Sequence, residues 1–208
     1  MEYEVRYYFP TEKLEYLLRM LRRIDGLKME ERSYEKTMQF DHPCKEMSFY
    51  NKEIDGRFRI RITKNNTISK CKISWKRRLP TTIENEINKE EEVEININYN
   101  EYDNLMFIIN NVLKMKSVES YERYRTIFVN DEIETAVDEY PFGIALEIEN
   151  KSSNPEEVVK KWVEIIGLDI NKAYRLSWDD KYSSLCKSQN VKRYNHVAFG
   201  LPMPKVIE

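Results

Sequence analysis

Basic side chains alternate with other residues in three stretches of this sequence. The residues that share the alternation are Arg57, Arg59 and Arg61; Lys70, Lys72 and Lys76; and Arg123 and Arg125. With 14 arginines in 208 residues, chance predicts only about 0.06 R-x-R-x-R triples, so the triple that starts at Arg57 is significant. Guanidinium groups offer paired donors that match phosphate oxygens. Alternating arginines could therefore bind successive phosphoryl groups of a polyphosphate.

Acidic side chains alternate in the same way in three other stretches. These residues are Glu2 and Glu4; Glu90, Glu92 and Glu94; and Glu147 and Glu149. A chain with 34% charged residues contains several such pairs by chance, so these pairs matter only because they lie in strand-forming sequence. Hard divalent cations prefer oxygen ligands, which carboxylates supply. A space lined by both signs of charge could hold a polyanion together with its cations.

The elements that must position these residues are strands. Because successive side chains of a strand point to opposite faces, each stretch has one charged face and one apolar face. Phe58, Ile60 and Ile62 face away from the arginines, and Val93 and Ile95 face away from the glutamates. Strands are expected over residues 2–9, 29–40, 57–62, 70–76, 90–97, 118–129, 132–138 and 144–149.

Helices are expected between and after these strands. Pro10 opens the first, and Asn100 could cap the second. Asn154 and Pro155 supply a cap and a first-turn proline for the third, which Gly167 ends. A short helical stretch is expected near 178–186. Turns are expected at 65–66 and 130–131, and a polar loop over 80–88.

Length and pattern predict one α+β domain over residues 1–208. The helices offer apolar stripes, so one assembly is a barrel with a charged lumen and helices packed on its outside. Most tyrosines are then expected on the exterior or rim. The pattern alone equally allows an open sheet whose charged face lies in water.

Composition limits the partners. A formal charge of −2 gives no global basic field, so nucleic acid is not expected. Three cysteines without a C-x-x-C and two separated histidines predict a cytoplasmic protein without structural zinc. No apolar run approaches the length of a membrane span, and a charged strand rather than a signal peptide opens the sequence, so no membrane partner is expected. A homodimer is compatible with the sequence.

The order of the motifs resembles one family. The opening E-Y-E-V-R is similar to the E-x-E-x-K signature of the CYTH superfamily, the triphosphate tunnel metalloenzymes, which include class IV adenylate cyclases and thiamine-triphosphatases. The arginine strand, the lysine strand ending S-W-K, the glutamate strand, Y-E-R-Y-R, A-V-D-E-Y-P-F-G and E-I-E follow in the family's order. The resemblance covers residues 2–150 and, more loosely, the helical part 151–208.

The resemblance implies a closed eight-strand antiparallel β-barrel, a tunnel that binds a linear triphosphate with Mg2+ or Mn2+. By position it implies metal ligands at Glu2, Glu4, Asp138, Glu147 and Glu149. It implies phosphate-binding roles for Arg57, Arg59, Arg61, Lys72, Lys76, Arg123 and Arg125. Catalytic roles fall to Arg6, Lys76 and Glu92. Arg6 departs from the signature, because a rigid guanidinium fork replaces the mobile point charge of lysine.

Three functions fit these features. The first is a metal-dependent phosphohydrolase that cleaves the terminal phosphate of inorganic triphosphate, a nucleoside triphosphate or thiamine triphosphate. The second is a class IV-type adenylate cyclase that makes cyclic AMP from ATP in the same lumen. The third is a binding module for triphosphate or polyphosphate without turnover. No separable purine pocket is evident in the sequence, which favours hydrolysis over cyclisation.

Overall fold

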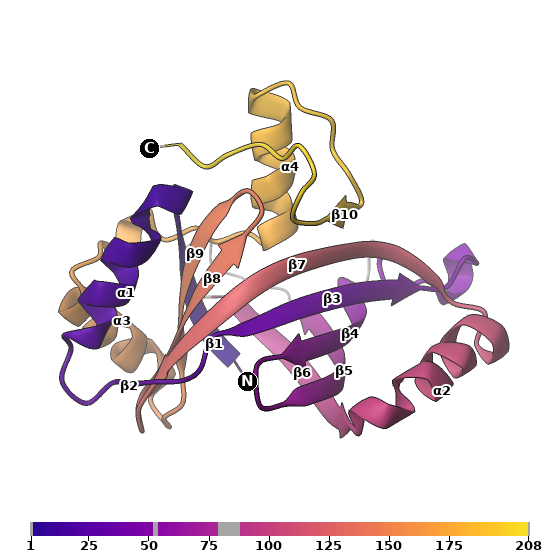
Figure 1. The fold of residues 1–208 in the computed structure, drawn as a ribbon, viewed down its shortest axis with the longest axis horizontal. Coiled ribbons are helices and arrows are strands. Elements are labelled where there is room, and N and C mark those ends of the chain that lie inside the picture. Colours follow the sequence, from indigo (N-terminus) through magenta and orange to yellow (C-terminus); the bar gives the residue numbers. More distant parts are fainter. Residues whose placement is uncertain (1, 52–53, 79–87, 208) are drawn as a thin grey trace.

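Antiparallel strands form most of the protein. The computed structural model describes residues 2–51, 54–78 and 88–207, without the side chains of residues 2, 78 and 88–90 (Figure 1). The long strands are β1 (Glu2–Phe9), β3 (Ser33–Asp41), β4 (Gly56–Lys64), β5 (Ser69–Arg78), β6 (Asn88–Ile97), β7 (Lys116–Val129), β8 (Ile133–Tyr140) and β9 (Gly143–Asn150). The two-residue strands β2 (Lys28–Met29) and β10 (His196–Val197) both pair with β7. Each strand expected from the alternation is present, while the loop expected over 80–88 falls almost entirely outside the described residues.

The helices lie where the capping signals predict them. They are α1 (Leu14–Arg22), α2 (Tyr102–Phe107) with a π-helical continuation (Ile108–Val112), α3 (Pro155–Ile166) and α4 (Trp178–Ser188). Gly167 ends α3 in the left-handed conformation, with φ 81°. Asn154 is the N-cap residue of α3, as predicted, but its side chain donates to Glu157 Oε2 and makes no cap hydrogen bond. The capping role expected for Asn100 is wrong, because Glu101 is the N-cap of α2 and the side chain of Asn98 caps the turn before it.

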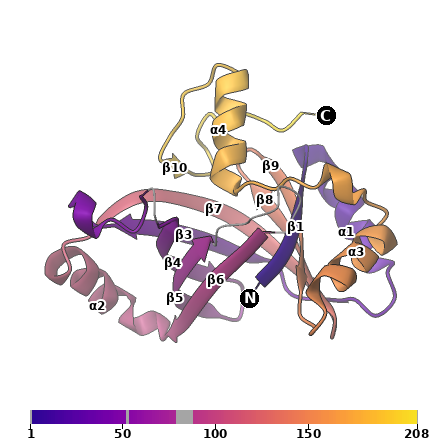
Figure 2. The same ribbon diagram turned by 180° about the vertical axis from the view of Figure 1, so that it is seen from behind.

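The sheet curls strongly (Figures 1 and 2). Its pairings join the long strands in the order β7-β3-β4-β5-β6-β1-β9-β8, and β7 also pairs with β8. The β7–β8 ladder has six residue pairs, whereas the β1–β6 contact, among the described residues, has the three from Glu2–Glu90 to Glu4–Asn88. The described sheet is a curled half-barrel. The predicted α+β class is confirmed, and complete closure into a tunnel stays a prediction.

The helices α1, α2 and α3 pack on the convex side of the sheet, whereas α4 begins at the cavity, where its first residue Trp178 lies among the lining residues. α1 and α3 cover β1, β8 and β9 through a core that includes Leu21, Leu146 and Trp162. α4 and the C-terminal segment form a second core with Phe142 and Tyr182, and α2 forms a third around Ile60 and Ile109. Figure 1 shows α1 with α3 at one end of the sheet and α2 at the other. No helix of the described residues is both long enough and apolar enough to cross a membrane.

One expected apolar face is only partly buried. Val93 and Ile95 of β6 are 56% and 55% exposed, so the prediction that they face a core is wrong. Ile97, two residues further on, does pack against the α2 cluster. The helix α2 has six residues, and within the described part of the chain its cluster reaches Ile97 but not Ile95. The alternation therefore predicted which side of the sheet each residue of β6 faces, but not whether other residues cover that side.

Candidate functional site

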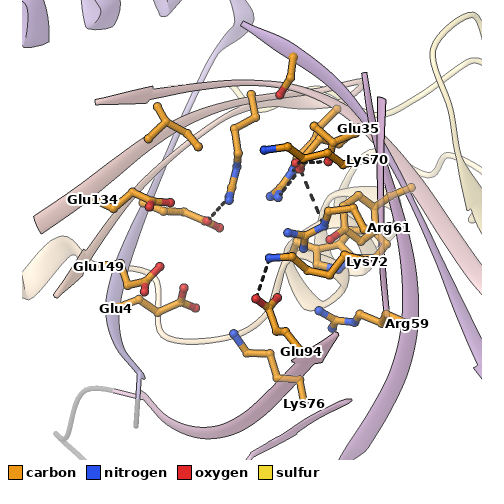
Figure 3. Close-up of a pocket in the computed structure, with 18 of the residues that line it drawn as sticks. Glu4, Glu35, Arg59, Arg61, Lys70, Lys72, Lys76, Glu94, Glu134 and Glu149 are labelled. Atoms are coloured by element: carbon orange, nitrogen blue, oxygen red, sulfur yellow. Dashed lines mark hydrogen bonds and ion pairs between the residues drawn. The ribbon is translucent and has the colours of Figure 1, made fainter. Parts of the chain in front are cut away.

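The curled sheet holds a cavity of about 580 Å3 on its concave side. Charged side chains from β1, β3 to β9 and the loop after β9 line it. Figure 3 shows these side chains converging from opposite sides, basic groups mostly on one and carboxylates on the other. The charges predicted from the alternation therefore meet in a shared space.

One side of the cavity is a basic wall, which consists of Arg57, Arg59 and Arg61 of β4 with Lys70, Lys72 and Lys76 of β5. The antiparallel register places Arg57 opposite Lys76 and Arg61 opposite Lys72. Directly opposed side chains of a strand pair lie on the same face, so these charges crowd together. Like charges at such spacing repel unless anions lie among them.

Carboxylates of β6 balance part of the basic wall. Lys72 Nζ lies 2.6 Å from Glu94 Oε2, and Lys76 Nζ lies 3.7 Å from Glu92 Oε2. Lys76 and Glu92, both predicted to be catalytic, are thus brought together at the cavity. The Lys72–Glu94 pair is about one-third exposed, so water weakens its attraction.

Arg59 is the exception in the basic wall. Its Nε is buried without a hydrogen-bond partner among the described residues. Burial, with the like charges of Arg57 and Arg61, lowers the pKa of Arg59. Figure 3 shows its guanidinium directed into the cavity. A buried N–H donor without a hydrogen-bond partner is costly, and an anion in the cavity would satisfy it.

The strands β7 and β8 contain ion pairs around one buried carboxylate. Asp138 is 0% exposed and accepts from Arg125 Nε and Nη2 at 2.6 Å each. Arg123 Nη1 donates to the same carboxylate at 2.6 Å, and Arg123 Nε donates to Glu35 at 2.8 Å. Burial alone would raise the pKa of Glu35, but Arg123 and Arg61 outweigh it and lower that pKa.

The same set of ion pairs continues onto β9 and β1. Arg125 Nη2 donates to Glu147 at 2.7 Å, and Arg6 Nε donates to the other oxygen of Glu147 at 2.5 Å. Arg6 Nη2 reaches Glu4 at 3.0 Å. Burial would raise the pKa of Glu147, but Arg6 and Arg125 outweigh it and lower that pKa. We call Glu35, Arg123, Asp138, Arg125, Glu147 and Arg6 the buried ion-pair network.

The network changes how several predicted site residues are interpreted. Arg123 and Arg125 were expected to bind phosphate, yet both already hold carboxylates. Asp138 and Glu147 were expected to bind metal, yet both hold arginines. Arg6, at the position of the family's lysine, bridges two glutamates. In this structure these residues neutralise one another.

The remaining carboxylates form an acidic wall, which consists of Glu4 of β1, Glu134 of β8 and Glu149 of β9. Glu149 is paired in register with Glu4 on one side and with Glu134 on the other. Figure 3 shows the three side by side, facing the lysines. Lys151 Nζ lies 2.9 Å from Glu149 and 3.5 Å from Glu134.

The acidic wall fits a hard cation in chemistry but does not enclose one. Its donors are all carboxylate oxygens, the ligands that Mg2+ and Mn2+ prefer. Among the described residues, however, no three His, Cys, Asp or Glu side chains are grouped closely enough to hold a metal ion. A cation here would need oxygens from a ligand as well. The side chain of Glu2, also predicted to bind metal, is outside the described part.

The structure of this chain aligns with several solved protein structures over most of its length. The PH1012 protein of Pyrococcus horikoshii OT3 aligns with a TM-score of 0.65 and 20% identity, over 86% of this chain and 98% of its own. The PH1819 protein of the same organism aligns at 0.63 and 22%, over 88% and 99%. HpAC1 of Hippeastrum, an adenylyl cyclase candidate described as having a dominant triphosphatase activity, aligns at 0.60 and 17%, over 88% and 96%.

This chain has the CYTH-type fold. The resemblance predicted from the sequence is thereby confirmed, and the shared feature is a curled antiparallel sheet with a charged interior. No protein-family model matches the sequence, and no curated protein aligns with it significantly.

Several residues of this cavity were given no site role by the sequence reasoning. Glu35, Glu134 and Tyr121 all line it. Tyr121 contradicts the expectation that tyrosines lie on the exterior or rim, because it shares the inward parity of Arg123 and Arg125. Its position two residues before Arg123 places it on the same face, and this spacing could have identified it as a cavity residue. In the same way, the alternating polar residues of β3 could have identified Glu35.

Proposed function

We propose that this protein is a divalent-metal-dependent triphosphatase that binds a linear triphosphate between its basic and acidic walls. The observation that carries the proposal is Arg59, a half-buried arginine whose buried Nε has no hydrogen-bond partner among the described residues, set between two further arginines. In this proposal the sheet closes around the bound ligand as a complete eight-strand barrel. The dominant triphosphatase activity described for HpAC1 is consistent with it.

The two walls have different tasks. Arg57, Arg59 and Arg61 bind successive phosphoryl groups through charge-assisted hydrogen bonds. Glu4 and Glu149, with oxygens of the substrate, would hold Mg2+ or Mn2+. Such a cation supplies charge neutralisation and a more acidic bound water. Catalysis then depends on positioning and charge stabilisation rather than on a covalent nucleophile.

Hydrolysis is favoured over cyclisation by the lining of the cavity. Three aromatic side chains reach it, Tyr121, Tyr140 and Trp178. These rings pack against one another, with Tyr121 4.4 Å from Trp178 and 5.7 Å from Tyr140 between centroids. A purine would have to separate them to stack, whereas an inorganic triphosphate needs only charges.

The test is a product analysis with inorganic triphosphate, ATP and thiamine triphosphate, each with Mg2+ or Mn2+. We expect orthophosphate release that chelation abolishes. Glu149→Gln should remove turnover without changing the melting temperature, and Glu156→Gln, an exposed glutamate of α3, is the matched control. Pyrophosphate plus cyclic AMP from ATP would instead assign a cyclase. Tight binding without any product would assign a binding module.

A further inference from the structure

Tyr121 is held rigidly at the cavity by its ring. It is 4% exposed and is the inward residue of β7 that precedes Arg123. Trp178 of α4 and Tyr140 of β8 pack against the ring, and the Arg123 guanidinium lies 5.8 Å from its centroid. Packing on several sides fixes the ring, so the phenolic oxygen has a defined position.

The hydroxyl of Tyr121 lies among cations. Thr37 of β3 hydrogen-bonds it, and the charges that act on it most strongly are those of Arg61, Arg123 and Arg59. Thr37 also accepts from Arg61 Nε at 3.2 Å, so the phenol and this guanidinium share one partner. The phenol is therefore a neutral donor near Arg59, whose buried Nε has no hydrogen-bond partner among the described residues.

We propose that Tyr121 is a ligand-binding residue of this cavity, its hydroxyl donating a hydrogen bond to a phosphate oxygen that Arg59 and Arg61 also bind. The proposal rests on the proposed function only for the identity of the ligand, an inorganic or organic triphosphate. It assigns to Tyr121 a contact that neither the alternation of charges nor the family resemblance assigns.

The surroundings of Tyr121 make this contact dependent on pH. Burial alone would raise its pKa, but Arg61, Arg123 and Arg59 outweigh burial and lower the pKa to about 8. The acidic groups nearby are engaged elsewhere: Glu35 holds Arg123, and Glu119 of the same strand binds Arg193 at 2.7 Å. Two further groups face this region, the phenol of Tyr140 and the carboxylate of Asp179, which acts on Arg59.

The sign of the effect follows from charge. Below its pKa the phenol can donate to phosphate, whereas above it the tyrosinate accepts only and repels the anion. Affinity for triphosphate is therefore complete at neutral pH and is lost as pH rises through about 8. If only the neutral form binds, the dissociation constant rises about tenfold between pH 7 and 9.

The test is calorimetric binding of inorganic triphosphate, with chelator and without metal, to the wild type, Tyr121→Phe and Tyr124→Phe. Tyr124 is the matched control, because it lies on the same strand with the opposite parity. We expect Tyr121→Phe to bind about tenfold more weakly than the wild type at pH 7 and equally at pH 9. Titration of the ligand itself is common to all three proteins and cancels in the ratio.

A second readout uses the ultraviolet absorbance of tyrosinate. One tyrosine should ionise near pH 8 in the wild type, be absent from Tyr121→Phe, and ionise at higher pH once triphosphate is bound. Equal affinity of the wild type and Tyr121→Phe at pH 7, or the same loss in Tyr124→Phe, would overturn the assignment. Since neither readout needs turnover, binding that depends on Tyr121 without hydrolysis would refute the triphosphatase and leave this inference standing.

Discussion

Replacing Arg59 by methionine should weaken the ligand complex and stabilise the free protein. Methionine keeps much of the length of arginine but removes the charge. The free protein then no longer buries a guanidinium whose Nε lacks a partner among the described residues. An unsatisfied buried polar group costs about 1–3 kcal/mol, so the unfolding free energy should rise by up to that amount. In a chain of this size each kcal/mol corresponds to roughly 2–4 °C in melting temperature.

The effect on binding should be larger and opposite. A guanidinium that makes two charge-assisted hydrogen bonds to a phosphate contributes about 1.5–3 kcal/mol through each. Arg59→Met should therefore raise the Kd for inorganic triphosphate by roughly two to four orders of magnitude. Orthophosphate should lose far less, because it cannot extend along the rest of the arginine row.

The assay is thermal unfolding with and without triphosphate, combined with calorimetry. Arg61→Met is the matched control, because Arg61 has partners in the free protein: Thr37 at 3.2 Å and Glu35 at 3.9 Å. This control should lose both stability and affinity. If Arg59→Met destabilised the free protein as much as Arg61→Met, the idea that Arg59 lacks a hydrogen-bond acceptor until an anion binds would be refuted.

Three further predictions concern the ion pairs and the cation. Asp138→Asn should destabilise the protein by about 3–5 kcal/mol in denaturant unfolding, because it leaves two buried arginines without their shared carboxylate; a loss below 1 kcal/mol would contradict this. Stability should hold above the ordinary titration range of glutamate and fall progressively as pH drops through and below that range, because the lowered pKa values of Glu35 and Glu147 mean that protons bind more readily to the unfolded chain. Unfolding measured against pH checks this, and a stability that did not fall below about pH 4 would refute it. Chelation should abolish turnover yet leave the melting temperature unchanged, since the acidic wall does not enclose a cation by itself.

The sequence predicted which face of each strand is charged, because alternation depends only on the geometry of a single strand. The arginine row of β4 therefore lies where the pattern placed it. What alternation could not show is which opposite charges already satisfy each other. That depends on register: the β7–β8 hairpin sets Arg125 directly opposite Asp138, so two residues expected to bind different ligands bind each other in this structure. Nor could alternation show that the hydrophobic cluster at α2 includes Ile97 while Ile95 is left exposed.

The uneven seams of the sheet have a mechanical consequence. The buried ion-pair network braces β3, β7, β8, β9 and β1 into a stiff arc, whereas β1 and β6 share three residue pairs within the described part of the chain. Fluctuations that open the cavity should therefore concentrate where β6 meets β1. Amide hydrogens along that short seam would exchange with solvent sooner than those of the β7–β8 ladder. A ligand bound between the basic and acidic walls would hold β1 and β6 together and slow that exchange.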